Sequence, residues 1–229
     1  MYKIINKILA VFEENGLWED GVELVGSWCF NLYQEHLGVK SYPLKTQDID
    51  FLIPVPFKSR KHIDLVEELG KIGFQHSFNQ DGSIYLWNAE LKIEFLVPQK
   101  SKGDDKAIDI KGLSIKAIPL RFVNILLDHP ITVEDNGINI RIPNPSAFCL
   151  QKIIVAFRRK KLDKRIKDLE QAIYVFEITN KNDLKHLFMS FPKPWQKAII
   201  INLKDSKKLL PLLEDDISRI LDTLQNTTI

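Results

Sequence analysis

The feature of this sequence that most constrains its fold is a short apolar strand that carries two acidic residues. The segment DIDFLI, residues 48–53, alternates Asp48 and Asp50 with Ile49 and Phe51. Because successive side chains of a strand point to opposite faces, the two aspartates share one face about 7 Å apart, and the two apolar residues share the other. At an effective dielectric constant of about 20, two such charges repel by roughly 2 kcal/mol. We therefore expect a positive group to offset this repulsion.

The composition sets broad limits on the class of protein. With 229 residues, 45% of them hydrophobic, the chain is long enough for one large or two modest domains with a real core. A net charge of only +2 argues against a wholly polybasic nucleic-acid binder. No stretch approaches the ~20 apolar residues that span a bilayer, so we expect no membrane insertion. Two cysteines, Cys29 and Cys149, are too few for a disulfide framework, and we expect a cytoplasmic protein with reduced thiols.

The first 143 residues mix short strands with helices. Apolar spacing predicts helices over residues 3–15, 28–38, 60–72 and 120–128. Strands are predicted over residues 22–25, 48–53, 83–87 and 91–97, and Asn136-Gly137 predicts a hairpin within residues 131–142. In the helix over residues 60–72, we expect Ile63, Val66, Leu69 and Ile72 to face inward. A charged loop around residues 99–107 separates the strands from the next helix.

The remainder of the chain shows only helical patterns. Asn144 is placed to cap the first of these helices, with Pro145 at its first position. We expect a polar tail, residues 225–229, to fray. The sequence therefore predicts an α+β fold with two domains, residues 1–143 and residues 144–229, the second one helical.

Several motifs together resemble those of a known family. The segments are LVGSWCFNLYQ, KTQDIDFLIP, KIEFLVP, IRIPNPSAFCLQKIIV and KLDKRIKDLEQA, which run from about Val22 to Ala172. This combination resembles the nucleotidyltransferase fold of the DNA polymerase beta superfamily, and more narrowly a family of small prokaryotic nucleotidyltransferases of unassigned substrate. The resemblance implies a mixed sheet flanked by helices and followed by a C-terminal helical domain.

The resemblance also implies a reaction: Mg²⁺-dependent transfer of a nucleoside monophosphate from a nucleoside triphosphate to an acceptor hydroxyl. Asp48, Asp50 and Glu94 would be catalytic and would bind two Mg²⁺ ions, which prefer hard carboxylate oxygens and clamp the attacking and leaving oxygens. The third acid, Glu94, would also orient or deprotonate the acceptor hydroxyl. It stands where the family more commonly has Asp. The acceptor stays open among a small molecule, an RNA end and a protein side chain.

Other residues are expected to hold the nucleotide. At Gly26 and Ser27 the backbone can approach a phosphate, and the following helix offers free amides. In the helical domain the candidate nucleotide-binding cations are Lys152, Lys164 and Arg165. Lys164 and Asp168 stand four residues apart, so we expect them to pair on one helix face.

Each motif also has an ordinary structural explanation. Asp-x-Asp is common on exposed strands, Gly-Ser often forms a turn with a helix cap, and Glu94 fits the solvent side of a half-buried strand. Two further functions therefore stay open: a catalytically inactive nucleotide- or partner-binding module of the same fold, and RNA binding through the basic segment Arg158 to Lys167. That segment is equally typical of a solvated helix junction.

Overall fold

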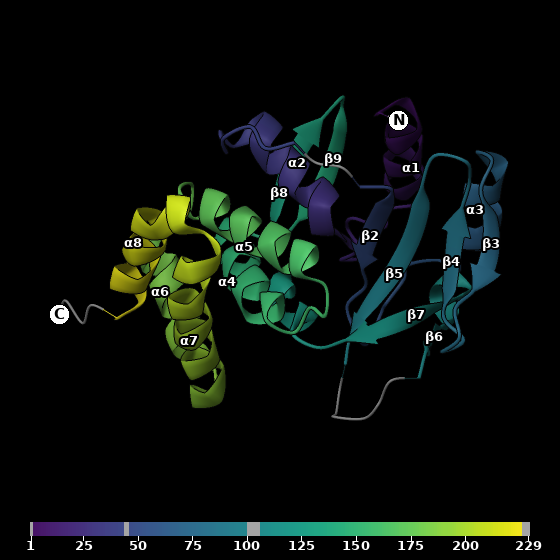
Figure 1. Ribbon diagram of the computed structural model, residues 1–229. Helices are drawn as coiled ribbons and strands as arrows, with labels where there is room; N and C mark the ends of the chain where they lie inside the picture. The colour runs from purple at the N-terminus through teal and green to yellow at the C-terminus, as the bar shows by residue number, and fades with distance from the viewer. Residues whose placement is uncertain (1, 44–45, 100–105, 226–229) are drawn as a thin grey trace. The chain divides into compact units, whose positions relative to one another are not determined.

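The computed structural model describes residues 2–43, 46–99 and 106–225 (Figure 1). The chain divides into two compact units: a first unit of residues 1–32 and 42–143, and a second unit of residues 33–41 and 144–229. One division therefore lies between Pro143 and Asn144, whereas residues 33–41 group with the later helices. Most of the charged loop around residues 99–107, and the tail after residue 225, lie outside the described residues.

The first unit holds the strands. Its elements are α1 (Tyr2–Glu14), β1 (Glu23–Val25), the start of α2 (Gly26–His36), β2 (Asp48–Leu52), α3 (Leu65–Lys71), β3 (Gln75–Phe78), β4 (Ile84–Trp87), β5 (Lys92–Pro98), β6 (Ile108–Ile110), η1 (Lys111–Leu113), β7 (Ile115–Leu120), η2 (Val123–Leu127), β8 (Ile131–Asp135) and β9 (Ile138–Ile142). The main sheet has the order β1-β2-β5-β4-β3, and β7 pairs with both β5 and β6. Pairing is parallel between β2 and β5 and between β5 and β7, and antiparallel elsewhere, so the sheet is mixed as expected.

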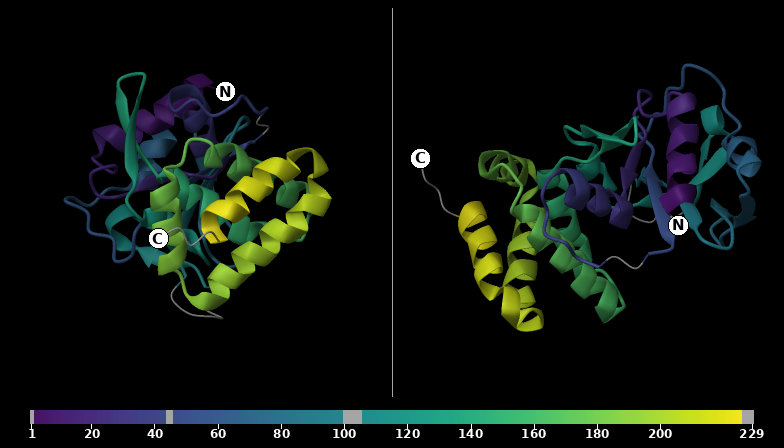
Figure 2. Two further views of the ribbon diagram at one scale, coloured as in Figure 1. Left: turned by 90° about the vertical axis from the view of Figure 1, so that its left-hand side faces the viewer. Right: turned by 90° about the horizontal axis from the view of Figure 1, so that it is seen from above.

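One face of this sheet is the apolar core of the first unit. Ile49 and Phe51 of β2 lie beside Ile93 and Phe95 of β5, and all four are fully buried. Helix α1 lies alongside the strands (Figure 2) and stacks Phe12 on Phe51, with ring centroids 3.9 Å apart. Burying one side of β2 so completely leaves Asp48 and Asp50 on the opposite side, as the alternation predicts.

Several predicted boundaries in the first unit are wrong. The helix expected over residues 60–72 begins only at Leu65, because the Asp64 carboxylate accepts a hydrogen bond from the Glu67 amide and caps it. Ile63 is buried outside that helix, where its amide donates to the Gly112 carbonyl. The helix expected over residues 120–128 is the short 3₁₀ helix η2. Strands β3, β6 and β7 were not predicted.

The hairpin prediction is confirmed. Asn136 and Gly137 both have positive φ, 50° and 78°, which matches the twist of the flanking strands β8 and β9. Asn144 also caps as expected, since its side-chain oxygen accepts a hydrogen bond from the Ala147 amide at 2.9 Å.

The second unit is helical. It contains the end of α2 and the elements α4 (Pro145–Ala156), α5 (Leu162–Phe176), α6 (Lys181–Ser190), α7 (Lys193–Leu209), η3 (Pro211–Leu213) and α8 (Glu214–Gln225). Helix α4 is buried along nearly its whole length, and Asn202 of α7 donates to its Ile153 carbonyl at 3.0 Å. Cys149 of α4 is a free thiol whose pKa burial raises to about 12. Within the described ranges no helix is long and apolar enough to cross a membrane.

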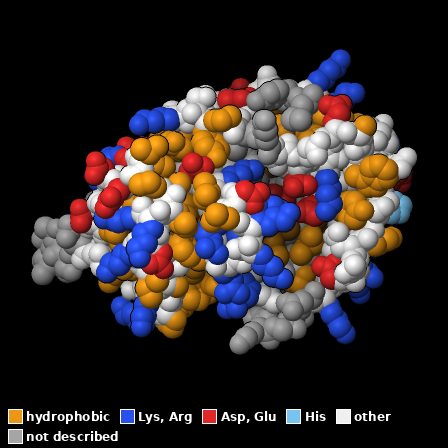
Figure 3. All heavy atoms as spheres, in the orientation of Figure 1, with side chains coloured by type: hydrophobic (Ala, Val, Ile, Leu, Met, Phe, Trp, Pro, Cys, Tyr) orange, Lys and Arg blue, Asp and Glu red, His pale blue; other side chains and the backbone are white. Residues whose placement is uncertain are grey.

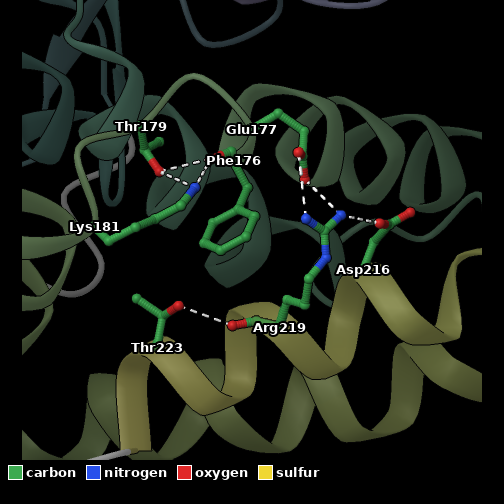
Figure 4. A network of polar contacts seen from close by, with 7 residues as sticks. All are labelled: Phe176, Glu177, Thr179, Lys181, Asp216, Arg219 and Thr223. Atoms are coloured by element: carbon green, nitrogen blue, oxygen red, sulfur yellow. Dashed lines mark hydrogen bonds and ion pairs between the residues drawn. The ribbon is translucent and has the colours of Figure 1, made fainter. Parts of the chain in front are cut away.

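A polar network connects α8 with the end of α5 (Figure 4). The Arg219 guanidinium donates to Glu177 at 2.8 Å and also to Asp216. Lys181 donates to the Phe176 carbonyl and to the Thr179 hydroxyl, and its ammonium lies over the Phe176 ring. These contacts satisfy the Phe176 carbonyl at the end of α5 and hold Glu177 against α8, so we assign this network a structural role.

Candidate active site

Three carboxylates lie side by side on the polar face of the sheet. In the parallel pairing of β2 and β5, Asp50 stands directly beside Glu94, and Asp48 stands beside Lys92. Neighbouring strands are about 4.8 Å apart, so Asp48, Asp50 and Glu94 occupy neighbouring positions on one face of the sheet. Asp48 is exposed, and Asp50 and Glu94 are half-buried. The structure thus places Asp48 and Asp50 of β2 and Glu94 of β5 on one face of the sheet.

The positive group expected beside the aspartates is Lys92, which the sequence reasoning missed. Its ammonium is in contact with Oε1 of Glu94 and lies 4.4 Å from the centre of the Tyr85 ring. Burial alone would lower the pKa of Lys92, but the hydrogen bond to Glu94 and the charges of Glu94 and Asp48 raise it above its usual value. The sequence does contain a signal for this contact: Lys92 and Glu94 are two residues apart on one strand, as Asp48 and Asp50 are, so their side chains share a face.

Gly26 stands against Asp50. The residue before it, Val25, stands opposite Asp50 in the antiparallel pairing of β1 and β2. Gly26 itself has a positive φ of +71° and is the first residue of helix α2. A Cβ atom here would lie closer than 3.0 Å to the Asp50 carboxylate. Ser27, half-buried, is the next residue of α2. The free amides at the start of this helix therefore open next to the carboxylates, an arrangement suited to a phosphate group.

Apolar and aromatic side chains border the acids on the polar face of the sheet. Farther along the strands lies an apolar cluster of Val25, Leu52, Leu96, Val123 and Leu126, which anchors the strands that carry the acids. On the β4 side, Tyr85 stands beside Glu94 and Trp87 beside Lys92. Trp87 is 41% exposed, which is high for a large aromatic residue.

The expected nucleotide-binding cations belong to the second unit, and one of them, Lys152, is paired with Asp168. The Lys152 ammonium donates to Oδ1 of Asp168 and Nε of Arg159 donates to Oδ2, both at 2.7 Å. Burial alone would raise the pKa of Asp168, but these two cations hold it below its usual value. The expected pairing of Lys164 with Asp168 is wrong: Lys164 is exposed, and both oxygens of Asp168 bind other residues.

Arg165, the third expected cation, lies beside Arg159. Its Nη2 donates to the Arg159 carbonyl at 3.3 Å and its guanidinium lies over the Phe157 ring, 5.0 Å from the centre. Arg159 was not among the predicted nucleotide-binding residues. It lies between α4 and α5, so its contact with Asp168 of α5 does not follow the spacing of residues on one helix. Acidic and basic side chains are interspersed over the face drawn in Figure 3, in keeping with the net charge of +2.

The donor set on the sheet fits a divalent cation. Asp48, Asp50 and Glu94 supply the hard carboxylate oxygens that Mg²⁺ prefers. The Lys92 ammonium contacts Glu94, and a divalent ion bound at these acids would neutralise further negative charge.

Carboxylates grouped on one face of a mixed sheet, beside a glycine that opens a helix, are typical of an enzyme that acts on phosphorylated substrates. A comparison with protein families identifies the class of enzyme. A nucleotidyltransferase family model matches residues 3–197, and the chain belongs to this family. It is therefore an enzyme of the nucleotidyl-transferring class. No curated protein matches the chain.

Three of the solved structures that match the chain have TM-scores below 0.5. The solution structure of the antibiotic-resistance factor ANT(2'')-Ia matches with a TM-score of 0.43 and 14% identity, over 95% of this chain and 96% of that one. An antigenic nucleotidyltransferase-like protein from Paracoccidioides brasiliensis matches with a TM-score of 0.49 and 12% identity, over 93% of each chain. A crystal structure of ANT(2'')-Ia with adenylyl-2''-tobramycin matches with a TM-score of 0.44 and 13% identity, over 82% of this chain and 95% of that one.

Proposed function

We propose that this nucleotidyltransferase moves a nucleoside monophosphate from a nucleoside triphosphate to an acceptor hydroxyl, in a Mg²⁺-dependent reaction at Asp48, Asp50 and Glu94. The observation that carries the proposal is the grouping of these three carboxylates on one sheet face, with Gly26 against Asp50. Bound Mg²⁺ would supply charge stabilisation for the attacking and leaving oxygens. Asp48, Asp50 and Glu94 are the residues that would hold two such ions.

Residues of the protein bind the phosphates, orient the acceptor and accept its proton. The amides of Gly26 and Ser27 bind phosphate oxygens at the start of α2. Glu94 orients the acceptor hydroxyl and accepts its proton as the oxygen attacks the α-phosphorus and pyrophosphate leaves. Since the strand order puts Gly26 and the aspartates on one side of Glu94, we place the acceptor on the other side, over Tyr85 and Trp87 of β4.

The second unit contributes cations in this proposal. Its candidate nucleotide-binding cations are Lys152, which is buried in its ion pair with Asp168, the exposed Lys164 and the half-buried Arg165. We accordingly assign residues 1–143 as the catalytic domain and residues 144–229 as the helical domain. We place the reaction in the cytoplasm, where the thiols of Cys29 and Cys149, which form no disulfide, stay reduced.

The test is a calorimetric titration of ATP, CTP, GTP and UTP into the protein with Mg²⁺. We expect at least one nucleotide to bind, and an Asp48→Asn, Asp50→Asn double variant to lose that binding. Glu134→Gln, which removes an exposed acid of the β8–β9 hairpin, is the control and should bind as the wild type does. Incubation of the nucleotide with candidate acceptors, followed by mass spectrometry, then identifies the product. If no triphosphate binds at millimolar concentration, the proposal is wrong.

A further inference from the structure

Lys92 occupies an unusual place for a lysine in a site proposed to bind cations. Its backbone stands beside Asp48, its ammonium is in contact with Oε1 of Glu94, and it lies over the Tyr85 ring. Its side chain is 32% exposed and that of Glu94 is 23% exposed, so the pair is partly shielded from water. An ion pair shielded in this way is screened less by salt than one on an open surface.

We infer that Lys92 is a built-in counter-ion of the carboxylate group: its ammonium neutralises Glu94 while no metal ion is bound and gives up Oε1 when a divalent cation enters. This inference rests on the proposed function, because it assumes that the three acids bind a metal ion. It adds a positioning residue to the site, since Lys92 acts on the reaction through Glu94.

Electrostatics supports this role in the absence of metal. Without a nearby cation, Asp48, Asp50 and Glu94 place three negative charges on adjacent strand positions, and each neighbouring pair costs roughly 2 kcal/mol at an effective dielectric of about 20. The Lys92 ammonium is the positive group in contact with Oε1 of Glu94. It holds the Glu94 carboxylate on the polar face and limits the repulsion.

The same contact makes Lys92 compete with a metal ion. A divalent cation that takes Oε1 of Glu94 as a ligand must displace the ammonium or pull the carboxylate away from it. The repulsion between the ammonium and the incoming ion also weakens binding. Removing the Lys92 charge should therefore strengthen metal binding and weaken the metal-free fold, two effects that a purely structural ion pair would not combine.

The experiment is Mn²⁺ titration, followed by electron paramagnetic resonance of the free ion, on the full-length wild type and on Lys92→Met. We expect Lys92→Met to bind Mn²⁺ about tenfold more tightly, and its melting temperature without metal to be lower than that of the wild type. Saturating Mn²⁺ should restore most of the lost melting temperature. Lys58→Met is the matched control: Lys58 is exposed in the loop after β2, and its replacement should leave Mn²⁺ affinity unchanged.

Two further variants keep the test decisive. Lys92→Arg keeps the charge and should bind Mn²⁺ within about twofold of the wild type; Lys92→Gln replaces Lys92→Met if that variant fails to fold. Equal or weaker Mn²⁺ binding by the neutral variants, or tighter binding by Lys92→Arg as well, overturns the inference. Failure of the proposed function looks different, because then the wild type itself binds no Mn²⁺ that depends on Asp48 and Asp50.

Discussion

The carboxylate of Asp50 fills the space where a Cβ atom of residue 26 would stand, so only glycine fits at Gly26 beside the acid group. We predict that Gly26→Ala moves Asp50 and weakens Mn²⁺ binding at least about tenfold, as calorimetry would show, in addition to a cost of about 1 kcal/mol for a side chain at positive φ.

Gly82→Ala separates these two effects. Gly82 also has positive φ, +83°, but no atom lies within 4 Å of its Cβ position. This variant should lose a similar free energy of unfolding from backbone strain and keep wild-type Mn²⁺ affinity. If the two variants bind Mn²⁺ equally well, the close approach of Gly26 to Asp50 has no part in the site.

A second prediction concerns pH and Glu23. This β1 side chain is fully buried, with Oε1 accepting from Nε of Arg141 at 3.4 Å and Oε2 without a hydrogen-bond partner among the described residues. Burial raises the pKa of Glu23 to about 7, although Arg141 acts in the opposite direction. The folded state therefore keeps a proton that the unfolded state has lost between about pH 4.5 and 7.

Stability should accordingly fall as pH rises through this window. Up to roughly 3 kcal/mol of the free energy of unfolding is present below pH 4.5 and lost above pH 7 through this one group. Urea titrations at several pH values should show a shallower fall for Glu23→Gln than for the wild type. Glu134→Gln, at an exposed position, should follow the wild-type curve. Parallel curves for wild type and Glu23→Gln would contradict the raised pKa.

The two thiols give a third prediction. Cys29 and Cys149 are both buried and form no disulfide, and burial also raises the pKa of the Cys149 thiol to about 12, so we expect neither thiol to be reactive in the folded protein. We expect a chromogenic disulfide reagent to react with neither thiol in the native protein and with both in 6 M guanidinium chloride, a routine denaturing concentration. Rapid reaction of either thiol under native conditions would show that its helix opens locally.

Local patterns predicted the parts of the fold that local chemistry determines. The strand with Asp48 and Asp50, the Asn136-Gly137 hairpin and the Asn144 cap each follow from spacing or from one residue's conformational preference. Strand β3, QHSF, was missed because it is an edge strand with polar, mostly exposed side chains and no apolar alternation. Such a strand is specified by its pairing with β4 and not by its own composition.

The same limit applies to the site. Alternation predicted which face carries the acids, but the pairing of β2 with β5, which sets Asp50 beside Glu94, joins residues far apart in the sequence. Helical spacing indicated Lys164 as the partner of Asp168, whereas Lys152, sixteen residues earlier, is the actual partner. Spacing rules describe neighbours on one element, and buried charges take partners across elements.

That buried pair supports a last prediction. Asp168→Ala leaves the Lys152 ammonium, whose side chain is 8% exposed, without its carboxylate, and should lower the free energy of unfolding by about 3 kcal/mol. Lys164→Ala should change it by less than about 0.5 kcal/mol, because Lys164 is exposed.

Since Lys152 and Arg159 hold the pKa of Asp168 below its usual value of 3.8, the wild type should also lose stability as pH falls below about 4, and Asp168→Ala should not show this loss. Urea denaturation followed by circular dichroism measures both effects. A larger loss from Lys164→Ala than from Asp168→Ala would favour the helical pairing that the structure replaces.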